Sequence, residues 1–451
     1  MQIKFCGADR GVTGSCHLLK TEKYNILVDC GMFQGGNFNE GKNHDDFPFD
    51  VSKIDTLLVT HGHLDHVGRI PKLIKDGFQG KIWMTKATCE FAYLIWVDAY
   101  HIMKENHKRY GNPILFDETD IATAQQFCEG ISYDKEIEVM PGVKAVWKDA
   151  GHIFGSAFIE VVADGKKIAF SGDIGNENVP ILKDTDKLSP DVDVLLCEST
   201  YGDRIHEPED VRREAILKLL KEGVAKGGTI MVPAFSLERT QEFLYELNKL
   251  SEYDKTLPKM PIFLDSPLAI DATAVYGKYP EYYDEEAMRL HMVGDDFLDF
   301  PNLQMTHTRE ESKKINHVPG PKMIIAGSGM MNGGRIIHHA FRYVPDPNST
   351  LIIVGYQAKG TLGRRLYEGA DKVKIFGEDV KVNCTVKAMG ALSAHGDQKK
   401  LLDWAGSSGS APKKIFCVHG EEHAVTELAH RLRDKYKVEA FVPDEEEVFD
   451  I

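Results

Sequence analysis

The sequence predicts an α/β protein in which a stacked-sheet sandwich with helices is interrupted by a second unit built on a parallel sheet. Three observations support this fold class. Many short apolar and β-branched runs fill the first two hundred residues, strands alternate with helices after about Asp203, and short strands return near residue 380. We expect a first part over 1–204, an insertion over 205–385 and a C-terminal return over 386–451.

The strands expected in the first part are apolar or β-branched runs that end at Gly, Asp or Asn. They are Ile3–Phe5, Tyr24–Val28, Thr56–Val59, Lys81–Met84, Ala145–Lys148, Phe158–Val162, Lys167–Phe170 and Val194–Cys197. Helical patterns occur at Pro71–Asp76, Glu90–Tyr110 and Asp117–Glu129. Short strands in this number indicate a stacked-sheet sandwich with some helices.

Within the insertion the pattern changes to helices that alternate with strands. The expected elements are helix Glu207–Lys226, strand Thr229–Pro233, helix Arg239–Leu250, and strands Pro261–Leu264, Lys322–Ala326 and Leu351–Gly355. The last two strands are each followed by a Gly-rich turn and a helix. Such alternation is typical of a parallel sheet with helical crossovers. In the C-terminal return, strand Lys414–Val418 precedes helix Ala424–Tyr436.

The composition narrows the class of protein. The 451 residues are 42% hydrophobic and 27% charged, as in ordinary globular proteins, and the net charge is 54 − 69 = −15. So acidic a chain argues against a general polyanion binder, although a local basic cleft is still allowed. No window approaches the ~18 apolar residues of a membrane-spanning helix, and the start lacks a signal-peptide core. The eight cysteines form no C-x-x-C pair, which favours reduced thiols. We therefore expect a soluble, cytoplasmic protein.

The strongest functional signal is the heptapeptide T-H-G-H-L-D-H, which directly follows a predicted strand. It places His61, His63, Asp65 and His66 on one loop at a strand end. Imidazole and carboxylate groups are zinc ligands, and this loop offers no thiolate. A polar, His-rich turn is the alternative interpretation, but chance seldom gives H-x-H-x-D-H after an apolar strand. The motif therefore predicts a metal site.

One loop cannot close two metal shells, so further ligands must come from other strand ends. His152, Asp173 and His419 each lie near a predicted strand end beside a glycine, where the backbone can turn a side chain inward. Taken singly, each would be an ordinary surface or core residue, but beside the histidine-rich loop each is a candidate ligand. Asp29, in V-D-C-G, is placed to accept an N–H from a ligating imidazole and fix its tautomer. A turn aspartate before glycine is the alternative.

At this point the sequence resembles the metallo-β-lactamase fold and, within it, the β-CASP ribonucleases. The metal motifs of that fold match, in order, His61, His63, Asp65, His66, His152 and Asp173, and its first motif matches Asp29. Glu198 in E-S-T-Y-G matches motif A of the β-CASP family, His395 in S-A-H-G-D matches motif B, and His419 matches motif C. The resemblance covers essentially the whole chain. It implies a metallo-β-lactamase αββα sandwich with an inserted parallel-sheet β-CASP domain.

The same resemblance implies a zinc-dependent ribonuclease that hydrolyses phosphodiester bonds of single-stranded RNA, as an endonuclease, a 5′-exonuclease or both. Two Zn²⁺ ions are implied, with His61, His63 and His152 on one, Asp65, His66 and His419 on the other, and Asp173 bridging them. The implied catalytic residues are Asp65 as proton acceptor, His395 as proton donor to the departing 3′-oxygen, Glu198 as its orienting partner, and Asp29. A homodimer is implied by resemblance alone.

Two Gly-rich turns of the insertion are candidate RNA contacts. Both follow strands and open helices, a geometry suited to phosphates, although most such turns are simply tight turns. Between Met331 and Lys374 there are seven Lys or Arg and three Asp or Glu, so this segment is basic in an acidic chain. The expected contacts to the RNA backbone, which would not read sequence, are Ser328, Gly329, Arg335, Lys359 and Arg364.

Two other functions remain open from the sequence. A small-ester or thioester hydrolase could use the same scaffold, but a small substrate needs no second lobe. A non-catalytic RNA-processing scaffold would be expected to have lost ligands, whereas all the expected ligand types are present here. The sequence also leaves open the cleavage mode and the physiological RNA.

Overall fold

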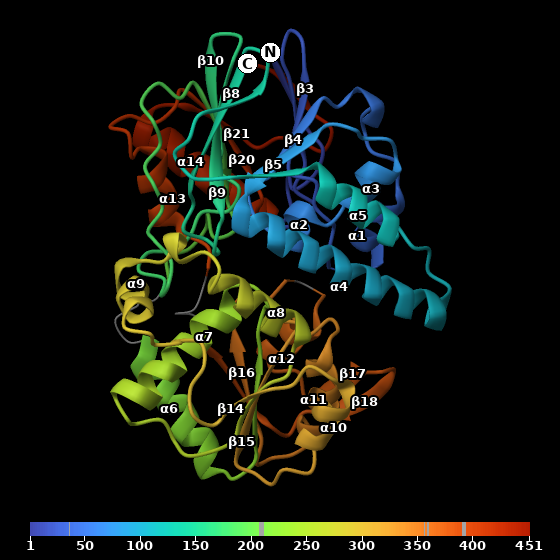
Figure 1. The fold of residues 1–451 in the computed structure, drawn as a ribbon, viewed down its shortest axis with the longest axis vertical. Helices are drawn as coiled ribbons and strands as arrows, with labels where there is room; N and C mark the ends of the chain where they lie inside the picture. Colours follow the sequence, from blue (N-terminus) through green and yellow to red (C-terminus); the bar gives the residue numbers. More distant parts are fainter. Residues whose placement is uncertain (36, 207–211, 356, 359, 390–393) are drawn as a thin grey trace. The chain divides into compact units, whose positions relative to one another are not determined.

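The chain folds, in a computed structural model, into two compact units (Figure 1). The first unit joins Met1–Ile205 to His395–Ile451, and the second is His206–Ala394. The structure describes residues 1–35, 37–206, 212–355, 357–358, 360–389 and 394–451. The second unit extends past residue 385, the boundary that the sequence pattern predicts, because β19 (Thr385–Met389) pairs with a strand of that unit's sheet.

Two seven-stranded sheets form the centre of the first unit. The first sheet contains, in spatial order, β22 (Val448–Asp450), β1 (Gln2–Phe5), β2 (His17–Lys20), β3 (Asn25–Val28), β4 (Thr56–Leu58), β5 (Lys81–Thr85) and β6 (Cys128–Ile131). The second contains β21 (Glu439–Phe441), β20 (Lys414–Val418), β11 (Val194–Glu198), β10 (Lys166–Phe170), β9 (Ala157–Ala163), β8 (Val143–Asp149) and β7 (Ile137–Met140). Strands β3 to β6 run parallel, as do β10, β11, β20 and β21. Each parallel set therefore brings its carboxyl ends to one edge.

Apolar side chains of the two sheets pack against each other and form the core of the first unit. Phe5 and Leu19 of the first sheet share a buried cluster with Phe170, Leu196 and Phe416 of the second. Helices cover the outer faces (Figure 1). They are α2 (Leu64–Val67), α3 (Ile70–Lys75), α4 (Lys86–Tyr110) and α5 (Glu118–Phe127) beside the first sheet, and α13 (Gln398–Ala405) and α14 (Glu422–Tyr436) beside the second. The predicted αββα sandwich is confirmed.

Local sequence signals explain where several of these helices begin. The Thr85 hydroxyl accepts the Thr88 N–H at the start of α4, and Asp117 forms a reciprocal capping box with Asp120 at the start of α5. At the start of α13 the Asp397 side chain accepts the Lys400 N–H. Short helical segments complete the unit: α1 (Asn37–Gly41), η1 (Lys42–His44) and η2 (Val51–Lys53).

A six-stranded parallel sheet forms the centre of the second unit. Its spatial order is β14 (Leu303–Met305), β13 (Ile262–Leu264), β15 (Lys322–Ala326), β12 (Thr229–Pro233), β16 (Thr350–Val354) and β19. The other elements are α6 (Arg212–Ala225), α7 (Arg239–Asn248), η4 (Lys249–Tyr253), α8 (Pro267–Tyr276), η5 (Pro280–Tyr282), α9 (Glu285–Met292), α10 (Arg309–Ile315), α11 (Arg335–Tyr343), α12 (Leu362–Tyr367) and the hairpin of β17 (Lys372–Ile375) and β18 (Glu378–Lys381). The parallel sheet predicted for the insertion is therefore present.

None of the helices in the described part of the chain combines the length and apolarity that crossing a lipid bilayer requires.

Candidate metal centre

The histidine-rich loop lies at the carboxyl end of β4 and continues into α2. His63 holds the N-cap position of α2 with extended backbone (φ −70°, ψ 150°), while Asp65 and His66 already belong to the helix. Glycine is needed at position 62, because an added Cβ would lie 2.8 Å from the Cβ of Phe91 in α4. The loop is therefore packed closely against α4.

The remaining predicted ligands come from the second sheet. His152 follows β8, Asp173 follows β10 and His419 follows β20. These strands point the same way, so their carboxyl ends share one edge of the sheet. Gly172 precedes Asp173 with φ +53°, and an added Cβ there would lie 2.6 Å from the Cβ of Thr60. The two sheets thus meet at this edge, and residues distant in sequence become neighbours.

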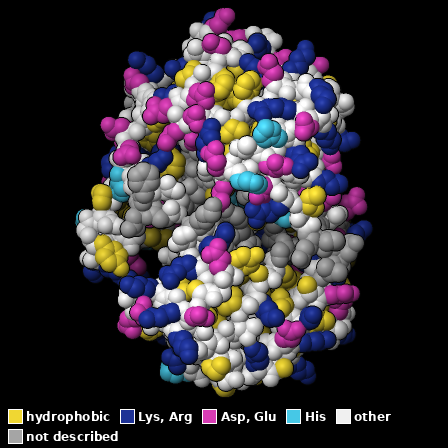
Figure 2. Space-filling view, turned by 180° about the vertical axis from the view of Figure 1, so that it is seen from behind, with side chains coloured by type: hydrophobic (Ala, Val, Ile, Leu, Met, Phe, Trp, Pro, Cys, Tyr) yellow, Lys and Arg dark blue, Asp and Glu magenta, His cyan; other side chains and the backbone are white. Residues whose placement is uncertain are grey.

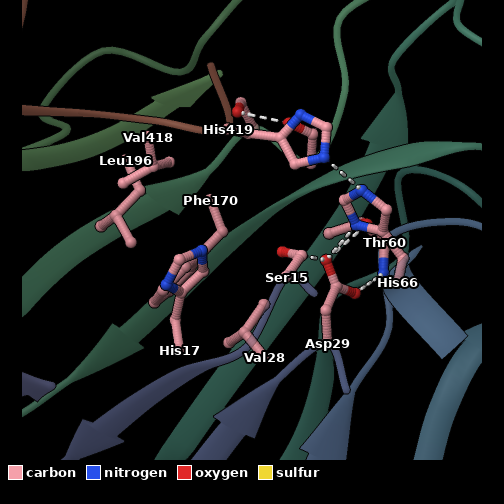
Figure 3. A pocket seen from close by; sticks show the side chains of 12 residues that line it. Ser15, His17, Val28, Asp29, Thr60, His66, Phe170, Leu196, Val418 and His419 are labelled. Atoms are coloured by element: carbon pink, nitrogen blue, oxygen red, sulfur yellow. Dashed lines mark hydrogen bonds and ion pairs between the residues drawn. The ribbon is translucent and has the colours of Figure 1, made fainter. Parts of the chain in front are cut away.

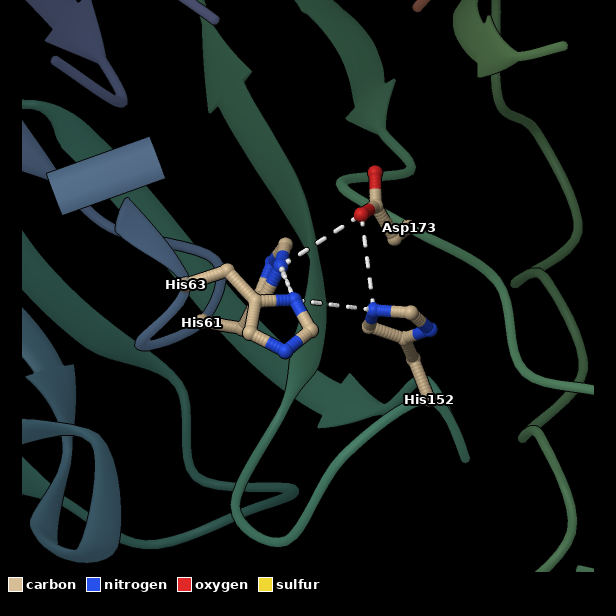
Figure 4. A group of neighbouring side chains, drawn as sticks. All are labelled: His61, His63, His152 and Asp173. Carbon is tan, nitrogen blue, oxygen red and sulfur yellow. Dashed lines mark hydrogen bonds and ion pairs between the residues drawn. The ribbon is translucent and has the colours of Figure 1, made fainter. Parts of the chain in front are cut away.

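Four side chains form the first donor group: His61, His63, His152 and Asp173 (Figure 4). The Nε2 atoms of His61 and His152 each lie 3.2 Å from Nδ1 of His63. The same two Nε2 atoms each lie 3.4 Å from Oδ2 of Asp173. A tetrahedral zinc with bonds of ~2.0–2.1 Å would separate its ligand atoms by about 3.3 Å. These distances fit one tetrahedral metal shell.

A second donor group adjoins the first and consists of Asp65, His66 and His419. Nε2 of His419 lies 3.2 Å from Nε2 of His66 and 3.5 Å from Oδ2 of Asp65. Nε2 of His66 lies 3.4 Å from Oδ1 of Asp173. The two oxygens of Asp173 therefore face different groups. Its buried Oδ1 has no hydrogen-bond partner among the residues that the structure describes, which fits a carboxylate that bridges two metals.

Asp29 lies behind the second group at the end of β3, buried and with φ +59°. Its Oδ2 is 2.7 Å from Nδ1 of His66, and it also accepts the Thr60 hydroxyl at 2.9 Å. Its Oδ1 accepts the Thr60 N–H at 2.8 Å. Because Nδ1 of His66 is engaged in this way, Nε2 is directed at the donor group.

His395 and Glu198 lie beside the first donor group. Nδ1 of His395 is 3.2 Å from Oε1 of Glu198 and 3.9 Å from Oδ2 of Asp173. The carboxylate of Glu198 also accepts the N–H groups of Ile174 and Thr200, so it is held from both sides. Burial opposes protonation of His395, but the neighbouring Glu198 carboxylate outweighs it and raises the pKa of His395.

Comparison with known proteins identifies the family. Three domains match in chain order: the metallo-beta-lactamase superfamily over residues 9–130, the Beta-Casp domain over 240–366, and the Zn-dependent metallo-hydrolase RNA specificity domain over 379–443. A protein named Ribonuclease TTHA0252 from Thermus thermophilus is 36% identical over 96% of both chains. The chain belongs to the β-CASP family of the metallo-β-lactamase superfamily. The resemblance and the fold class predicted from the sequence are confirmed.

Other relatives share most of their length with this chain. A protein named Transcription termination factor FttA from Methanocaldococcus jannaschii is 30% identical over 98% of this chain and 70% of its own. An RNase J-like protein from the same organism is 31% identical over 98% of this chain and 97% of its own. A crystal structure of a protein of unknown function from Enterococcus faecalis matches with a TM-score of 0.54 over 99% of both chains. At 11% identity, that match supports the fold alone.

Most ionisation states of this β-CASP centre suit a metal. His66 is the exception: burial would lower its pKa, but the Asp173 and Asp29 carboxylates outweigh burial and raise it well above the ordinary value. Burial lowers the pKa of His63 to about 4 and that of His61 well below its ordinary value, so both imidazoles are neutral at pH 7. Burial alone would raise the pKa values of Asp65 and Asp173, but nearby His419 and its neighbours outweigh this effect and lower both. Neutral imidazole and ionised carboxylate are the forms that bind metals. These residues therefore offer a donor set of the kind that holds a metal ion.

The predicted RNA contacts lie at the carboxyl edge of the β-CASP sheet, and their surroundings differ. Arg335 donates to Oδ1 of Asp265 at 2.7 Å and to the Thr306 carbonyl at 2.9 Å, so its guanidinium is tied into the unit. Arg364 is more exposed and pairs with Glu368 on its own helix. Ser328 accepts two backbone N–H groups of its own turn, and Gly329 packs against an aromatic ring. Lys359 lies outside the described residues.

Sequence reasoning missed several residues around the centre. Thr200, whose Oγ1 is 3.3 Å from Nδ1 of His419, and Thr60 lie within quoted motifs but received no role. His17 and Ser15 also line the space behind the centre. Their only sequence signal is a polar residue next to an apolar strand. In the second unit Asp265 binds Arg335 and His339, which lie far from it in sequence, so no local pattern marks this cluster.

Proposed function

We propose that this chain hydrolyses phosphodiester bonds of single-stranded RNA and uses two zinc ions. The observation that carries the proposal is Asp173, whose two carboxylate oxygens face two separate groups of histidine and aspartate donors. RNA as the substrate is supported by the RNA specificity domain matched over residues 379–443 and by the ribonuclease name of a relative.

The two metals would supply a water of lowered pKa and positive charge beside the phosphate. His61, His63 and His152 would hold one zinc, and Asp65, His66 and His419 the other. Asp65 is partly exposed and would accept the proton of the attacking water. Asp29 would keep His66 in the ligating tautomer through its 2.7 Å contact with Nδ1.

His395 would deliver a proton to the departing 3′-oxygen. Its Nδ1 faces Glu198, so the proton that it offers is carried on Nε2. Glu198 would orient the ring and favour the imidazolium through its charge. An alternative is that His395 is itself a ligand, because Asp173, Glu198 and His395 also bring their donor atoms within 4.8 Å of one another.

RNA would be gripped by local contacts. Figure 2 shows Lys and Arg side chains interspersed with Asp and Glu over the face that it presents, in keeping with the net charge of −15. Ser328, Gly329 and Arg364 remain our candidates at the carboxyl edge of the β-CASP sheet, whereas Arg335 is engaged by Asp265. The homodimer and the cytoplasmic location expected from the sequence stay predictions. Analytical ultracentrifugation of the purified protein tests the first.

The test uses purified protein of measured zinc content and one RNA, labelled separately at its 5′ and 3′ ends, with the 5′ end blocked or open. His61→Ala is the inactive reference. His101→Ala, which changes an exposed histidine on α4, is the matched control and should cleave like the wild type.

Internal fragments from the blocked RNA would establish endonuclease action, and mononucleotides released only from open 5′ ends would establish exonuclease action. A protein that binds two zinc ions and cleaves neither RNA would contradict the proposal. Hydrolysis of a small ester or thioester would then favour the alternative hydrolase, and no hydrolysis at all would favour a non-catalytic scaffold.

A further inference from the structure

A small cavity lies behind the metal centre, between the two sheets of the first unit (Figure 3). Its volume of about 10 Å³ is close to the ~10–15 Å³ that a single water needs. Asp29, His66 and His419 of the metal centre form part of its wall, together with Ser15 and His17. The apolar part of the wall is Val28, Phe170, Leu196 and Val418.

His17 is a polar residue of this wall that the catalytic scheme does not use. It begins β2, is 5% exposed, and packs edge-to-face against Phe5 at 5.7 Å between ring centres. Burial lowers the pKa of His17 to about 4, so the ring is neutral and carries one N–H donor and one acceptor. Its buried Nδ1 has no hydrogen-bond partner in the described part of the chain. A buried polar atom of this kind normally has a protein or water partner.

Ser15 offers a second polar group to the same space. Its hydroxyl lies 3.5 Å from Oδ2 of Asp29, which is longer than the ~2.5–3.0 Å of an ordinary O–H···O hydrogen bond. That oxygen is also the one that binds Nδ1 of His66 at 2.7 Å and the Thr60 hydroxyl at 2.9 Å. A group that positions the Ser15 hydroxyl therefore also affects the Asp29 carboxylate, which orients His66.

We infer that the cavity holds one ordered water, hydrogen-bonded to Nδ1 of His17 and to the hydroxyl of Ser15, and that His17 is a positioning residue of the metal centre. The inference rests on the metal centre proposed above. The water gives His17 its missing partner and holds Ser15 against Asp29, which in turn keeps Nε2 of His66 directed at the second donor group. Loss of such an outer group typically weakens metal binding by about 10- to 100-fold.

Three variants separate this role from simple packing. His17→Leu removes both ring nitrogens. His17→Asn keeps a polar atom near the place of Nδ1. Phe5→Leu removes the ring that packs against His17 but replaces no residue of the cavity wall. Each protein is loaded with zinc and titrated with a chelator, the metal-free form is melted, and the wild type is crystallised in zinc-loaded and metal-free forms.

We expect His17→Leu to release one of its two zincs about 10-fold more readily, His17→Asn to stay within about threefold of the wild type, and Phe5→Leu to lower the melting temperature while keeping both zincs. Crystals should show a water at Nδ1 of His17. Unchanged zinc retention in His17→Leu, equal loss in Leu and Asn variants, or no water at Nδ1 would each overturn the inference. If the wild type binds fewer than two zincs, the proposed metal centre fails, and the metal-free crystal still decides whether the water is present.

Discussion

Two buried aspartates, one in each unit, differ in how many hydrogen-bond donors surround their carboxylates. Asp173 follows β10 and Asp265 follows β13, and they are 2% and 0% exposed. Each has histidine at its carboxylate. Asp173 faces imidazoles of both donor groups, and its Oδ1 finds no hydrogen-bond donor within the described chain.

Asp265, in contrast, is fully supplied by protein donors. Its Oδ1 accepts from the Thr306 hydroxyl and from Arg335, both at 2.7 Å, and its Oδ2 accepts from Ser312 at 2.6 Å and His339 at 2.7 Å. The guanidinium already neutralises the charge. A buried carboxylate therefore indicates a metal site only where the protein leaves an oxygen without a donor.

The largest effect should follow the loss of the carboxylate that we propose bridges the two metals. Asp173→Asn removes the charge shared by both donor groups, so we expect both zincs to bind weakly and RNA cleavage to fall by about 10³-fold or more. Elemental analysis after gel filtration and a single-turnover cleavage assay measure the two effects. Full zinc content in this variant would mean that Asp173 is not the bridge.

The next prediction concerns His395, which lies beside Asp173 and the first donor group. His395→Ala should leave two zincs bound and lower turnover by about 10²- to 10⁴-fold, because a positioned proton donor is lost while the ligands stay in place. Zinc content and turnover are measured on the same preparation. If a zinc is lost with the imidazole, His395 belongs to the metal shell formed with Asp173 and Glu198.

Asp265 should matter for stability and not for metal binding. Asp265→Asn leaves the half-buried guanidinium of Arg335 without its counter-charge, so we expect a loss of about 3 kcal/mol in the free energy of unfolding of the second unit. Urea unfolding followed by circular dichroism measures this loss. Zinc content is the control and should equal that of the wild type. Loss of zinc in Asp265→Asn would contradict the claim that Asp173, and not Asp265, supports metal binding.

The carboxylate of Asp265 should also make the stability of the second unit depend on pH. Burial would raise the pKa of Asp265, but hydrogen bonds from His339, Ser312, Thr306 and Arg335 outweigh it and lower the pKa from 3.8 to about 2. Its contribution to stability, about 2 kcal/mol, is therefore complete above pH 3.8 and is lost as the pH falls through about 2. Urea unfolding at a series of acid pH values should show this loss in the wild type. Asp265→Asn should lack it, and parallel curves for the two proteins would contradict the assignment.

The smallest predicted effect concerns the two arginines of the β-CASP unit. Arg364→Ala should reduce the salt slope of RNA binding by about 1 and cost under about 1 kcal/mol of stability, because its pair with Glu368 is partly exposed to water. Arg335→Ala should instead destabilise the unit, since it removes the partner of Asp265. Filter binding at several salt concentrations, with zinc-loaded protein, measures the slope. An unchanged slope for Arg364→Ala removes it from the RNA contacts.

The sequence was sufficient for the parts of the site that are local. T-H-G-H-L-D-H places four donors on one strand-end loop, and glycines beside Asp173 and His419 mark other strand ends that the parallel pairing brings to the same edge. It could not show that Arg335 is engaged, because its partner Asp265 is distant in sequence. A Gly-rich turn followed by arginine looks the same whether the guanidinium binds phosphate or a buried carboxylate.

Other elements escaped prediction for a related reason. β2 (H-L-L-K) has only two apolar residues between a histidine and a lysine, so its pattern does not predict a strand, and His17 was missed with it. β6 directly follows α5, and the predicted helix Asp117–Glu129 ran into it. β19 was placed outside the insertion because its membership of the second sheet depends on pairing with β16. In each case the deciding interaction is between strands and not within one.

The most direct test of the central claim is a crystal structure of the zinc-loaded protein with anomalous scattering recorded at the zinc edge. The account predicts two peaks about 3.5–4 Å apart, one beside each oxygen of Asp173, within the groups formed by His61, His63 and His152 and by Asp65, His66 and His419. A single peak held by Asp173, Glu198 and His395, or peaks beside the fully paired carboxylate of Asp265, would contradict it.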